Sequence, residues 1–245
     1  MLAHYFTGLY RHTMERAYAH AHTAIVGSGD GEARVLECGA GIGATFDLLA
    51  SQMRLRTDQY RGIEWHEGAA AHARQRGLHV ETLDLNQGLS ADHADYSCIY
   101  ALSVLEHLLN PCALLRDCHR ALRPGGTLVL LTPNISTYFT AALILLGRMP
   151  STGPHPDSNA LLEREEIFKV NAAASGHRDA EAERPVHRHL IVFSYRVLRD
   201  YLRMAGFRDV QGRGFGLYPF PRALQPLLER LDPWHCHQMV FVARK

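Results

Sequence analysis

The sequence lacks a charge excess of either sign. Lysine and arginine together number 26 and aspartate and glutamate 25, which leaves a formal net charge of +1 over 245 residues. Binding to nucleic acid or to an anionic membrane draws on a concentrated positive field. The composition therefore argues against nucleic acid as a partner.

The sequence also lacks a cysteine framework and a membrane-length apolar run. Its five cysteines are scattered and include no C-x-x-C, which excludes the usual disulfide frameworks and zinc ribbons. The longest apolar stretch, residues 138–147, is far shorter than a membrane span, and residues 1–5 lack the pattern of a secretory signal. We therefore expect a cytoplasmic protein without a membrane partner.

What the sequence does contain is an alternation of short apolar runs with helical patterns. Runs typical of strands occupy residues 33–38, 60–65, 79–83, 96–102, 127–132, 207–212 and 238–243. Apolar residues at helical spacing cover residues 1–26, 46–53, 67–76, 111–122 and 194–205. Strands that alternate with helices predict an α/β fold, with a Rossmann-like, doubly wound sheet and right-handed crossovers.

A glycine-rich turn, residues 39–43, joins the first core strand to the next helix. Such a turn lets a ligand approach bare backbone beside the amide donors of a helix N-terminus. Its spacing satisfies the G-x-G-x-G form expected for S-adenosylmethionine and, with Ala44 in last place, the dinucleotide fingerprint. Glu64, at the end of the second strand, could accept hydrogen bonds from both ribose hydroxyls of either cofactor. The loop and Glu64 leave both cofactors open.

Further residues at successive strand ends favour S-adenosylmethionine. Glu37, just before the glycines, would attract an ammonium group and repel a pyrophosphate. Asp84 suits a hydrogen bond to the adenine amine, and Trp65 or Leu85 could cover the faces of the adenine ring. Each has a structural alternative, since Glu37 could cap a helix, Asp84 could close a turn and Trp65 could be core.

Together these motifs resemble the class I S-adenosylmethionine-dependent methyltransferase superfamily, particularly its small-molecule branch of ubiquinone-biosynthesis-like and MetW-like proteins. The resemblance rests on residues 35–43, 62–64, 84–86, 103–108, 122–126 and 132–134. It implies a seven-stranded sheet, mostly parallel with an antiparallel last strand. It also implies a cofactor site formed by Glu37, Gly39, Ala40, Gly41, Gly43, Glu64, Trp65, Asp84, Leu85 and Ser103. Residues 137–188 match no substrate-binding pattern, and Glu37 stands where aspartate is more usual.

We expect a single methyltransferase domain over residues 1–245. Its predicted parts are an N-terminal helix and loop (1–31), a cofactor-binding core (32–134), a substrate-side insertion or lid after strand five (135–193), and a C-terminal helix with the last strands (194–245). Four prolines between residues 150 and 185 mark the insertion as irregular. Within it we predict a helix over residues 160–170 and a mobile loop or lid over residues 171–183.

Methyl transfer from a sulfonium is an in-line displacement that needs an aligned acceptor and a site closed to water. The predicted acceptor is a small molecule, with the methylated atom left open among O, N, S and C. A general base assists a hydroxyl or a protonated amine, and we expect His107 or, from the far side of the pocket, His189 to fill this catalytic role. His107 could instead open a helix and pack on the next loop. Tyr138 and Phe139 are the expected walls of the substrate pocket.

Other functions compete with this prediction. Histidine pairs spaced by two, at 20/22, 187/189 and 235/237, suggest a metal site. No nearby cysteine or carboxylate completes a recognisable set of ligands, so we expect no metal. The glycine loop keeps an NAD(P)-dependent oxidoreductase open. The missing substrate signature keeps open a non-catalytic cofactor-binding subunit of a partner protein. A homodimer is also compatible with the sequence.

Overall fold

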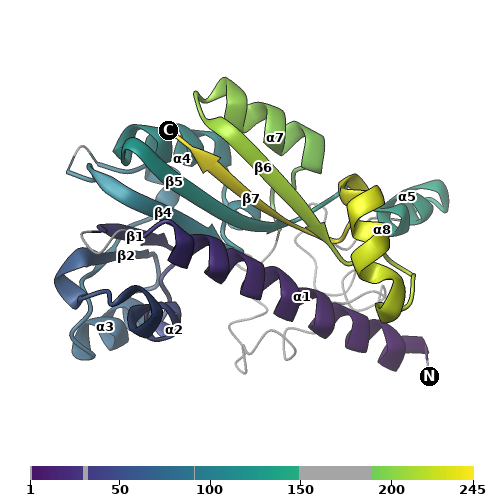
Figure 1. Ribbon diagram of the computed structural model, residues 1–245, viewed down its shortest axis with the longest axis horizontal. Helices are drawn as coiled ribbons and strands as arrows, with labels where there is room; N and C mark the ends of the chain where they lie inside the picture. The colour runs from purple at the N-terminus through teal and green to yellow at the C-terminus, as the bar shows by residue number, and fades with distance from the viewer. Residues whose placement is uncertain (1, 30–32, 91, 149–188) are drawn as a thin grey trace.

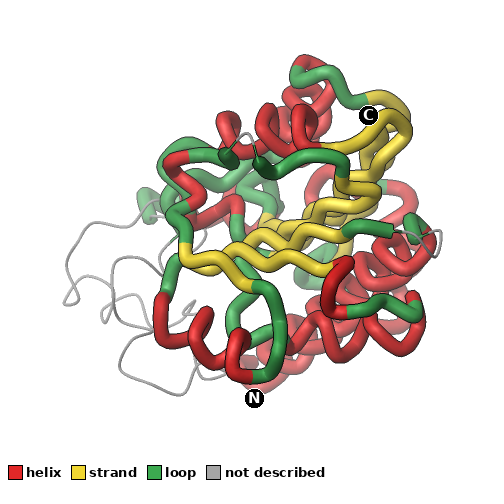
Figure 2. The backbone as a smooth tube through the Cα atoms, turned by 90° about the vertical axis from the view of Figure 1, so that its left-hand side faces the viewer, coloured by secondary structure: helices red, strands yellow, loops and turns green. Residues whose placement is uncertain are grey.

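The computed structural model describes residues 2–29, 33–90, 92–148 and 189–245. The helix predicted over residues 160–170 and the lid predicted over residues 171–183 lie outside these described residues. The described chain forms a twisted sheet with helices on both of its sides (Figures 1 and 2).

The described strands form one seven-stranded sheet in the order β3-β2-β1-β4-β5-β7-β6. Their bounds are β1 Val35–Cys38, β2 Tyr60–Glu64, β3 Val80–Thr82, β4 Tyr96–Leu102, β5 Leu122–Pro133, β6 Arg208–Phe215 and β7 Gln238–Arg244. Strands β1 to β5 pair in parallel, whereas β7 is antiparallel to both β5 and β6. The predicted α/β fold with an antiparallel last strand is confirmed.

The core divides between the two faces of the sheet because neighbouring residues of a strand point in opposite directions. The helix bounds are α1 Leu2–Gly27, α2 Ala44–Met53, α3 Glu67–Gln75, α4 Pro111–Ala121, α5 Tyr138–Leu145, α7 Tyr195–Met204 and α8 Gln225–Leu231. Leu36 and Leu128 pack with helices α4 and α7, whereas Val35 and Val129 pack with α1, α2 and α3. Both faces of the parallel strands are therefore covered, as their continuous apolar runs require.

Helix α1 lies along one face of the sheet because its inward stripe is small and apolar. Ala17, Ala21 and Ile25 recur every four residues and are fully buried. The 26 residues of α1 span roughly 39 Å at the usual helical rise. Figure 1 shows one end of α1 near β1 and the other near α5 and α8. This helix therefore reaches elements from the first and last parts of the chain.

The apolar run predicted at residues 138–147 forms α5. Only Thr140 and Leu143 of this helix are buried, while Ile144 and Leu145 are 59% and 87% exposed. Most of this apolar helix therefore lies at the surface and not in the core. None of the helices in the described ranges is long and apolar enough to cross a membrane.

Strand β6 runs to Phe215, three residues beyond the predicted end, and two further segments differ from the sequence prediction. Strand β5 begins at Leu122 instead of residue 127, because Leu122 pairs with Tyr96 of β4 and Gly125 N donates to Lys245 O at 3.1 Å. Between β6 and β7 the chain forms α8, with the short 3-10 helices η8 (Arg222–Leu224) and η9 (Pro233–His235) on either side, where no helix was predicted. Helix α8 has seven residues with a proline in its first turn, too short a run to show helical periodicity.

Candidate functional site

The glycine loop leaves β1 at the carboxyl edge of the sheet and enters α2. Gly39, Gly41 and Gly43 have positive φ angles of 81°, 52° and 80°, a region that strongly favours glycine. A Cβ atom at Gly39 would overlap Val104, and one at Gly43 would overlap Leu78. At Gly41 an added Cβ atom would meet no heavy atom within 4 Å. The outer glycines thus serve close packing, whereas Gly41 presents bare backbone to open space.

Glu64 ends β2 beside this loop, with its side chain buried. One carboxylate oxygen accepts a hydrogen bond from Gly41 N at 2.8 Å, and the other accepts one from His66 N at 3.0 Å. Ala40, also buried, donates its N–H to Ile63 O at 2.9 Å. The loop is therefore fastened to β2, and a carboxylate stands directly beside the exposed backbone of Gly41.

Glu37 lies in β1 behind the loop and is only 4% exposed. Its Oε2 accepts hydrogen bonds from Tyr60 OH at 2.5 Å and from Tyr100 OH at 3.0 Å. Burial raises the pKa of the Glu37 carboxyl to about 7, although hydrogen bonds from the tyrosines and Thr45 act in the opposite direction. The alternative of a helix cap is not supported, because the cap of α2 is Gly43, without a side-chain bond.

The residues expected around adenine follow β2 and β3. Asp84 is exposed, and its Oδ1 accepts hydrogen bonds from the backbone N and the side-chain Nδ2 of Asn86, each at 2.9 Å. It thereby closes the turn of the 3-10 helix η2 (Leu85–Gln87), the structural alternative weighed for it. Leu85 is buried in the core, whereas Trp65 is 49% exposed. The alternative that Trp65 is a core residue is therefore wrong.

Ser103 follows β4 in the left-handed conformation, with a φ of 56°. Side chains rarely adopt this backbone region, and such strain gathers at functional sites. Its Oγ lies 3.3 Å from Tyr18 OH of α1. Tyr10, two turns earlier on α1, has its pKa raised to about 12 by burial and by the nearby Tyr18 and Glu106. Helix α1 therefore brings two tyrosines to this edge, and neither was among the predicted site residues.

His107 and His189 lie together although 82 positions separate them in the sequence numbering. Their ring centroids are 5.1 Å apart and the rings are steeply inclined, at 70°. His107 is the last residue of the 3-10 helix η3 (Leu105–His107), so it does not open a helix as the structural alternative had it. The two predicted catalytic histidines are thus neighbours at the carboxyl edge of β4.

Glu106 accompanies these histidines and was not predicted. It is 2% exposed, accepts a hydrogen bond from Thr132 Oγ1 at 2.9 Å, and has its pKa raised to about 7 by burial. One carboxylate oxygen of Glu106 and one ring nitrogen each of His107 and His189 lie within 4.8 Å of one another. Such a donor set can also suit a divalent cation, although no metal site was predicted from the sequence. The adjacent glutamate and histidine in the sequence are the signal that could have singled out Glu106.

Tyr138 and Phe139, the expected substrate residues, begin α5. Tyr138 is 48% exposed, donates its hydroxyl hydrogen to Asp232 at 2.5 Å, and borders an open cavity of about 360 Å³. Phe139 packs against Phe6 of α1, with ring centroids 6.1 Å apart. The two aromatic residues therefore lie in different environments, and of the two it is Tyr138 that lines the cavity.

The glycine loop, Glu64, Ser103 and His107 lie at the carboxyl ends of parallel strands, and His189 contacts His107 there. The chain continues from β1 to one neighbour, β2, and later returns to the other, β4, so the strand order reverses beside β1. In open α/β sheets ligands bind at this edge, where the order reverses. The site is therefore placed where the fold provides a natural crevice.

Comparison with known proteins agrees with this geometry. Residues 10–212 match the family model described as "Methyltransferase domain". A protein of Mycobacterium tuberculosis (strain CDC 1551 / Oshkosh) named "Probable S-adenosylmethionine-dependent methyltransferase" is 35% identical over 105 residues, which cover 42% of this chain and 37% of that protein. A ubiquinone biosynthesis O-methyltransferase of Idiomarina loihiensis is 29% identical over 152 residues, covering 58% and 60%. The matches thus span less than two thirds of these relatives' lengths.

Solved structures share the fold at low sequence identity. A SAM-dependent methyltransferase of Thermotoga maritima superposes with a TM-score of 0.54 at 15% identity, over 100% of both chains. One from Archaeoglobus fulgidus gives a TM-score of 0.53 at 16% identity, over 87% of this chain and 86% of the other. Because the family match extends over most of the sequence, from residue 10 to residue 212, the chain belongs to the methyltransferase-domain family.

Proposed function

We propose that this protein is an enzyme that transfers a methyl group from S-adenosylmethionine to a small-molecule acceptor. The observation that carries the proposal is the pair formed by Gly41, where bare backbone meets open space, and the buried Glu64 carboxylate beside it. A ribose lying against the loop could donate its hydroxyl hydrogens to Glu64. Family membership and the names of the relatives support the same reaction.

The residues around the loop suit S-adenosylmethionine better than a dinucleotide. Glu37 is buried in the strand that leads into the loop and Glu64 lies beside Gly41, so two carboxyl groups lie near the loop. Anionic oxygens of a pyrophosphate would be repelled there, whereas an ammonium group would be attracted. The proposed cofactor site keeps the predicted set: Glu37, Gly39, Ala40, Gly41, Gly43, Glu64, Trp65, Asp84, Leu85 and Ser103.

S-adenosylmethionine, when bound, supplies a methyl group on an electrophilic sulfonium, which the acceptor attacks in line. The chain's own part is to hold the cofactor, to align the acceptor with the methyl group and to exclude water from the site. The loop amides and Glu64 would fix the cofactor, and Tyr18 braces Ser103 from α1. His107 or His189 would accept a proton from a hydroxyl or an ammonium acceptor. Tyr138 and Phe139 would bound the acceptor on the β5 side.

Parallel calorimetric titrations with S-adenosylmethionine, S-adenosylhomocysteine, NAD and NADP test this proposal. We expect saturable binding of the first two and none of the nicotinamide cofactors. Selective binding of NAD or NADP would instead establish the oxidoreductase alternative. Tight binding of S-adenosylhomocysteine without methyl transfer across a broad acceptor screen would favour the non-catalytic subunit. The single domain over residues 1–245, the cytoplasmic location and the homodimer stay predictions.

A further inference from the structure

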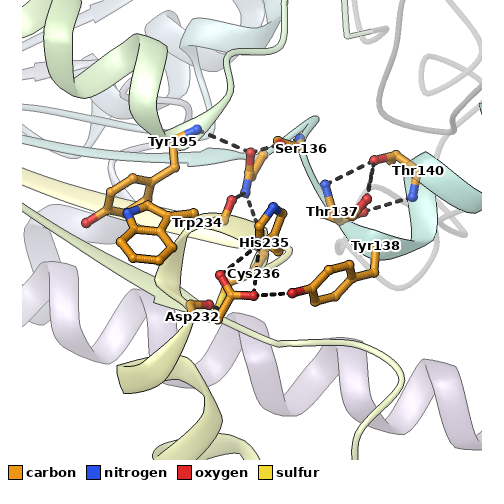
Figure 3. A network of polar contacts seen from close by, with 10 residues as sticks. Ser136, Thr137, Tyr138, Thr140, Tyr195, Asp232, Trp234, His235 and Cys236 are labelled. Atoms are coloured by element: carbon orange, nitrogen blue, oxygen red, sulfur yellow. Dashed lines mark hydrogen bonds and ion pairs between the residues drawn. The ribbon is translucent and has the colours of Figure 1, made fainter.

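A polar cluster joins the start of α5 to the turn before β7, apart from the proposed cofactor site (Figure 3). Asp232 accepts hydrogen bonds from Tyr138 OH at 2.5 Å and from His235 Nδ1 at 2.8 Å. The Tyr138 and His235 rings stack, with centroids 4.6 Å apart. Because Tyr138 and Asp232 are 94 residues apart in the chain, this cluster exists only in the folded sheet.

The cluster sets the tautomer of the His235 ring. Burial alone would raise the pKa of Asp232, but hydrogen bonds from Tyr138 and His235 lower it overall, so the side chain is a carboxylate near neutral pH. A carboxylate only accepts hydrogen bonds, so Nδ1 of His235 carries the hydrogen that it donates. In a neutral imidazole the other nitrogen, Nε2, then keeps its lone pair and can accept a hydrogen bond.

His235 and Tyr138 border the open cavity of about 360 Å³, a size typical of small-molecule sites. Ile135 and Ile144 supply apolar walls, and Thr137 adds a hydroxyl-bearing one. Ile135 comes two residues after β5 ends and donates its N–H to Phe193 O at 3.1 Å. The cavity therefore lies at the carboxyl edge of β5, next to β4, whose edge carries the two predicted catalytic histidines.

We propose that this cavity is a specificity subsite for the part of the methyl acceptor that lies away from the reacting atom. It receives a hydroxyl or amine hydrogen at Nε2 of His235, with carbon groups against Ile135 and Ile144. Asp232 is a positioning residue that holds the imidazole in the accepting tautomer. The assignment to the acceptor rests on the proposed methyltransferase function, whereas the chemistry of the cavity follows from its own residues.

The test uses two isomeric probes on the full chain, butan-1-ol and methyl propyl ether, which differ in that only the alcohol has a hydrogen to donate. Binding is followed by the methyl NMR signals of Ile135 and Ile144. We expect butan-1-ol to bind about tenfold more tightly than the ether, the effect of one net hydrogen bond. Equal affinity of the two probes, or no saturable shift with either, would overturn the subsite.

Variants separate the role of His235 from a structural one. In H235L the preference for butan-1-ol should fall to about one, while H235Q, which returns an acceptor atom, should recover part of it. D232N should reduce the preference without abolishing binding of the ether. H72L, at an exposed histidine of α3, serves as the matched control and should keep the full preference. A preference unchanged in H235L would contradict the inference, and thermal unfolding of each variant verifies that it is folded.

A titration with S-adenosylhomocysteine in the same samples distinguishes the two proposals. If S-adenosylhomocysteine binds but the alcohol is not preferred, the methyltransferase function stands and the subsite is wrong. If the alcohol is preferred but S-adenosylhomocysteine does not bind, the cavity recognises hydrogen-bond donors, and its assignment to the methyl acceptor is wrong.

Discussion

The backbone N–H of Gly41 donates a 2.8 Å hydrogen bond to the carboxylate of Glu64. Glu64 ends β2, Gly41 lies in the loop that follows the neighbouring parallel strand β1, and Gly41 is the loop glycine whose Cβ position is open to solvent. A ligand that takes hydrogen bonds from the loop and gives them to Glu64 must therefore engage both residues at once. The loop and the carboxylate form one binding unit, so a substitution in either should weaken cofactor binding.

Replacing Glu64 by alanine should weaken binding of S-adenosylhomocysteine by about 100-fold. The substitution removes an acceptor for two ribose hydroxyls, and each hydrogen bond to a charged group contributes about 1.5 kcal/mol or more. Calorimetry measures the loss directly. The control is Glu67→Ala, which removes an exposed carboxylate three residues away and should leave affinity unchanged. Equal affinities of the two variants would show that Glu64 does not hold the ribose.

Gly41→Val should abolish cofactor binding while leaving the protein folded. The valine side chain would fill the open space beside the loop and also strain a backbone with a φ of 52°. Gly125→Val separates these effects, because Gly125 has a φ of 76° and equally open surroundings but lies at the start of β5, away from the site. Both variants should lose about 1–2 kcal/mol of stability from backbone strain. Calorimetry should find binding lost in the first and intact in the second.

The affinity for S-adenosylhomocysteine should rise with pH through the titration of Glu37. Its carboxyl has a pKa of about 7, so the charge that attracts the ligand's ammonium group is incomplete at pH 6. If the ionised form alone binds, affinity increases about tenfold between pH 6 and pH 8. Glu37→Gln should remove this dependence. A wild-type affinity that is flat over this range would rule out contact between Glu37 and the ammonium group.

The same carboxyl should affect stability in the opposite direction. In the unfolded chain the pKa of Glu37 returns to its ordinary value near 4.3, so the folded protein binds the proton more tightly. The stability linked to this group is complete below the unfolded pKa and declines as pH rises through about 7. Urea unfolding between pH 5 and pH 8 should show a steeper decline for the wild type than for Glu37→Gln.

The strand, glycine loop and helix around residues 35–53 could be predicted because each signal is local. An apolar run, glycines at fixed spacing and a helical period all lie within twenty residues of sequence. The extension of β5 and helix α8 could not be predicted in this way. The first depends on pairing with Tyr96 and Lys245, which lie outside this segment of the sequence, and the second is a seven-residue helix after two prolines.

The site residues also divide into those with a local sequence signal and those that depend on contacts between distant parts of the chain. Glu37, Gly41 and Glu64 follow a spacing that the strands impose, so their positions could be read from the sequence. Tyr18 lies 85 residues from its partner Ser103, and no local pattern indicates that α1 crosses this edge of the sheet. Glu106 was overlooked because its burial, which gives it an unusual pKa, is a property of the packed fold.

Replacing Arg16 by leucine should destabilise the protein by about 3 kcal/mol, because it would leave the Glu229 carboxylate buried without its cation. Both guanidinium nitrogens of Arg16 donate to Glu229, at 2.8 and 2.6 Å, and the Glu229 side chain is only 3% exposed. Glu229 also accepts a hydrogen bond from Gly216 N at 2.7 Å, so the pair ties α1 to α8 and to the end of β6. Urea unfolding measures the loss.

The matched control for this prediction is Arg56→Ala, which breaks an ion pair with Asp58 in which both side chains are 64% exposed. Water already screens that pair, so its loss should cost less than about 1 kcal/mol. If Arg16→Leu were no more destabilising than Arg56→Ala, the Arg16–Glu229 pair would not fasten α1 to the C-terminal elements. Helix α1 would then be held by its apolar stripe and its remaining hydrogen bonds, such as the one that Tyr218 OH donates to Thr13 Oγ1, and we expect cofactor binding to survive the substitution.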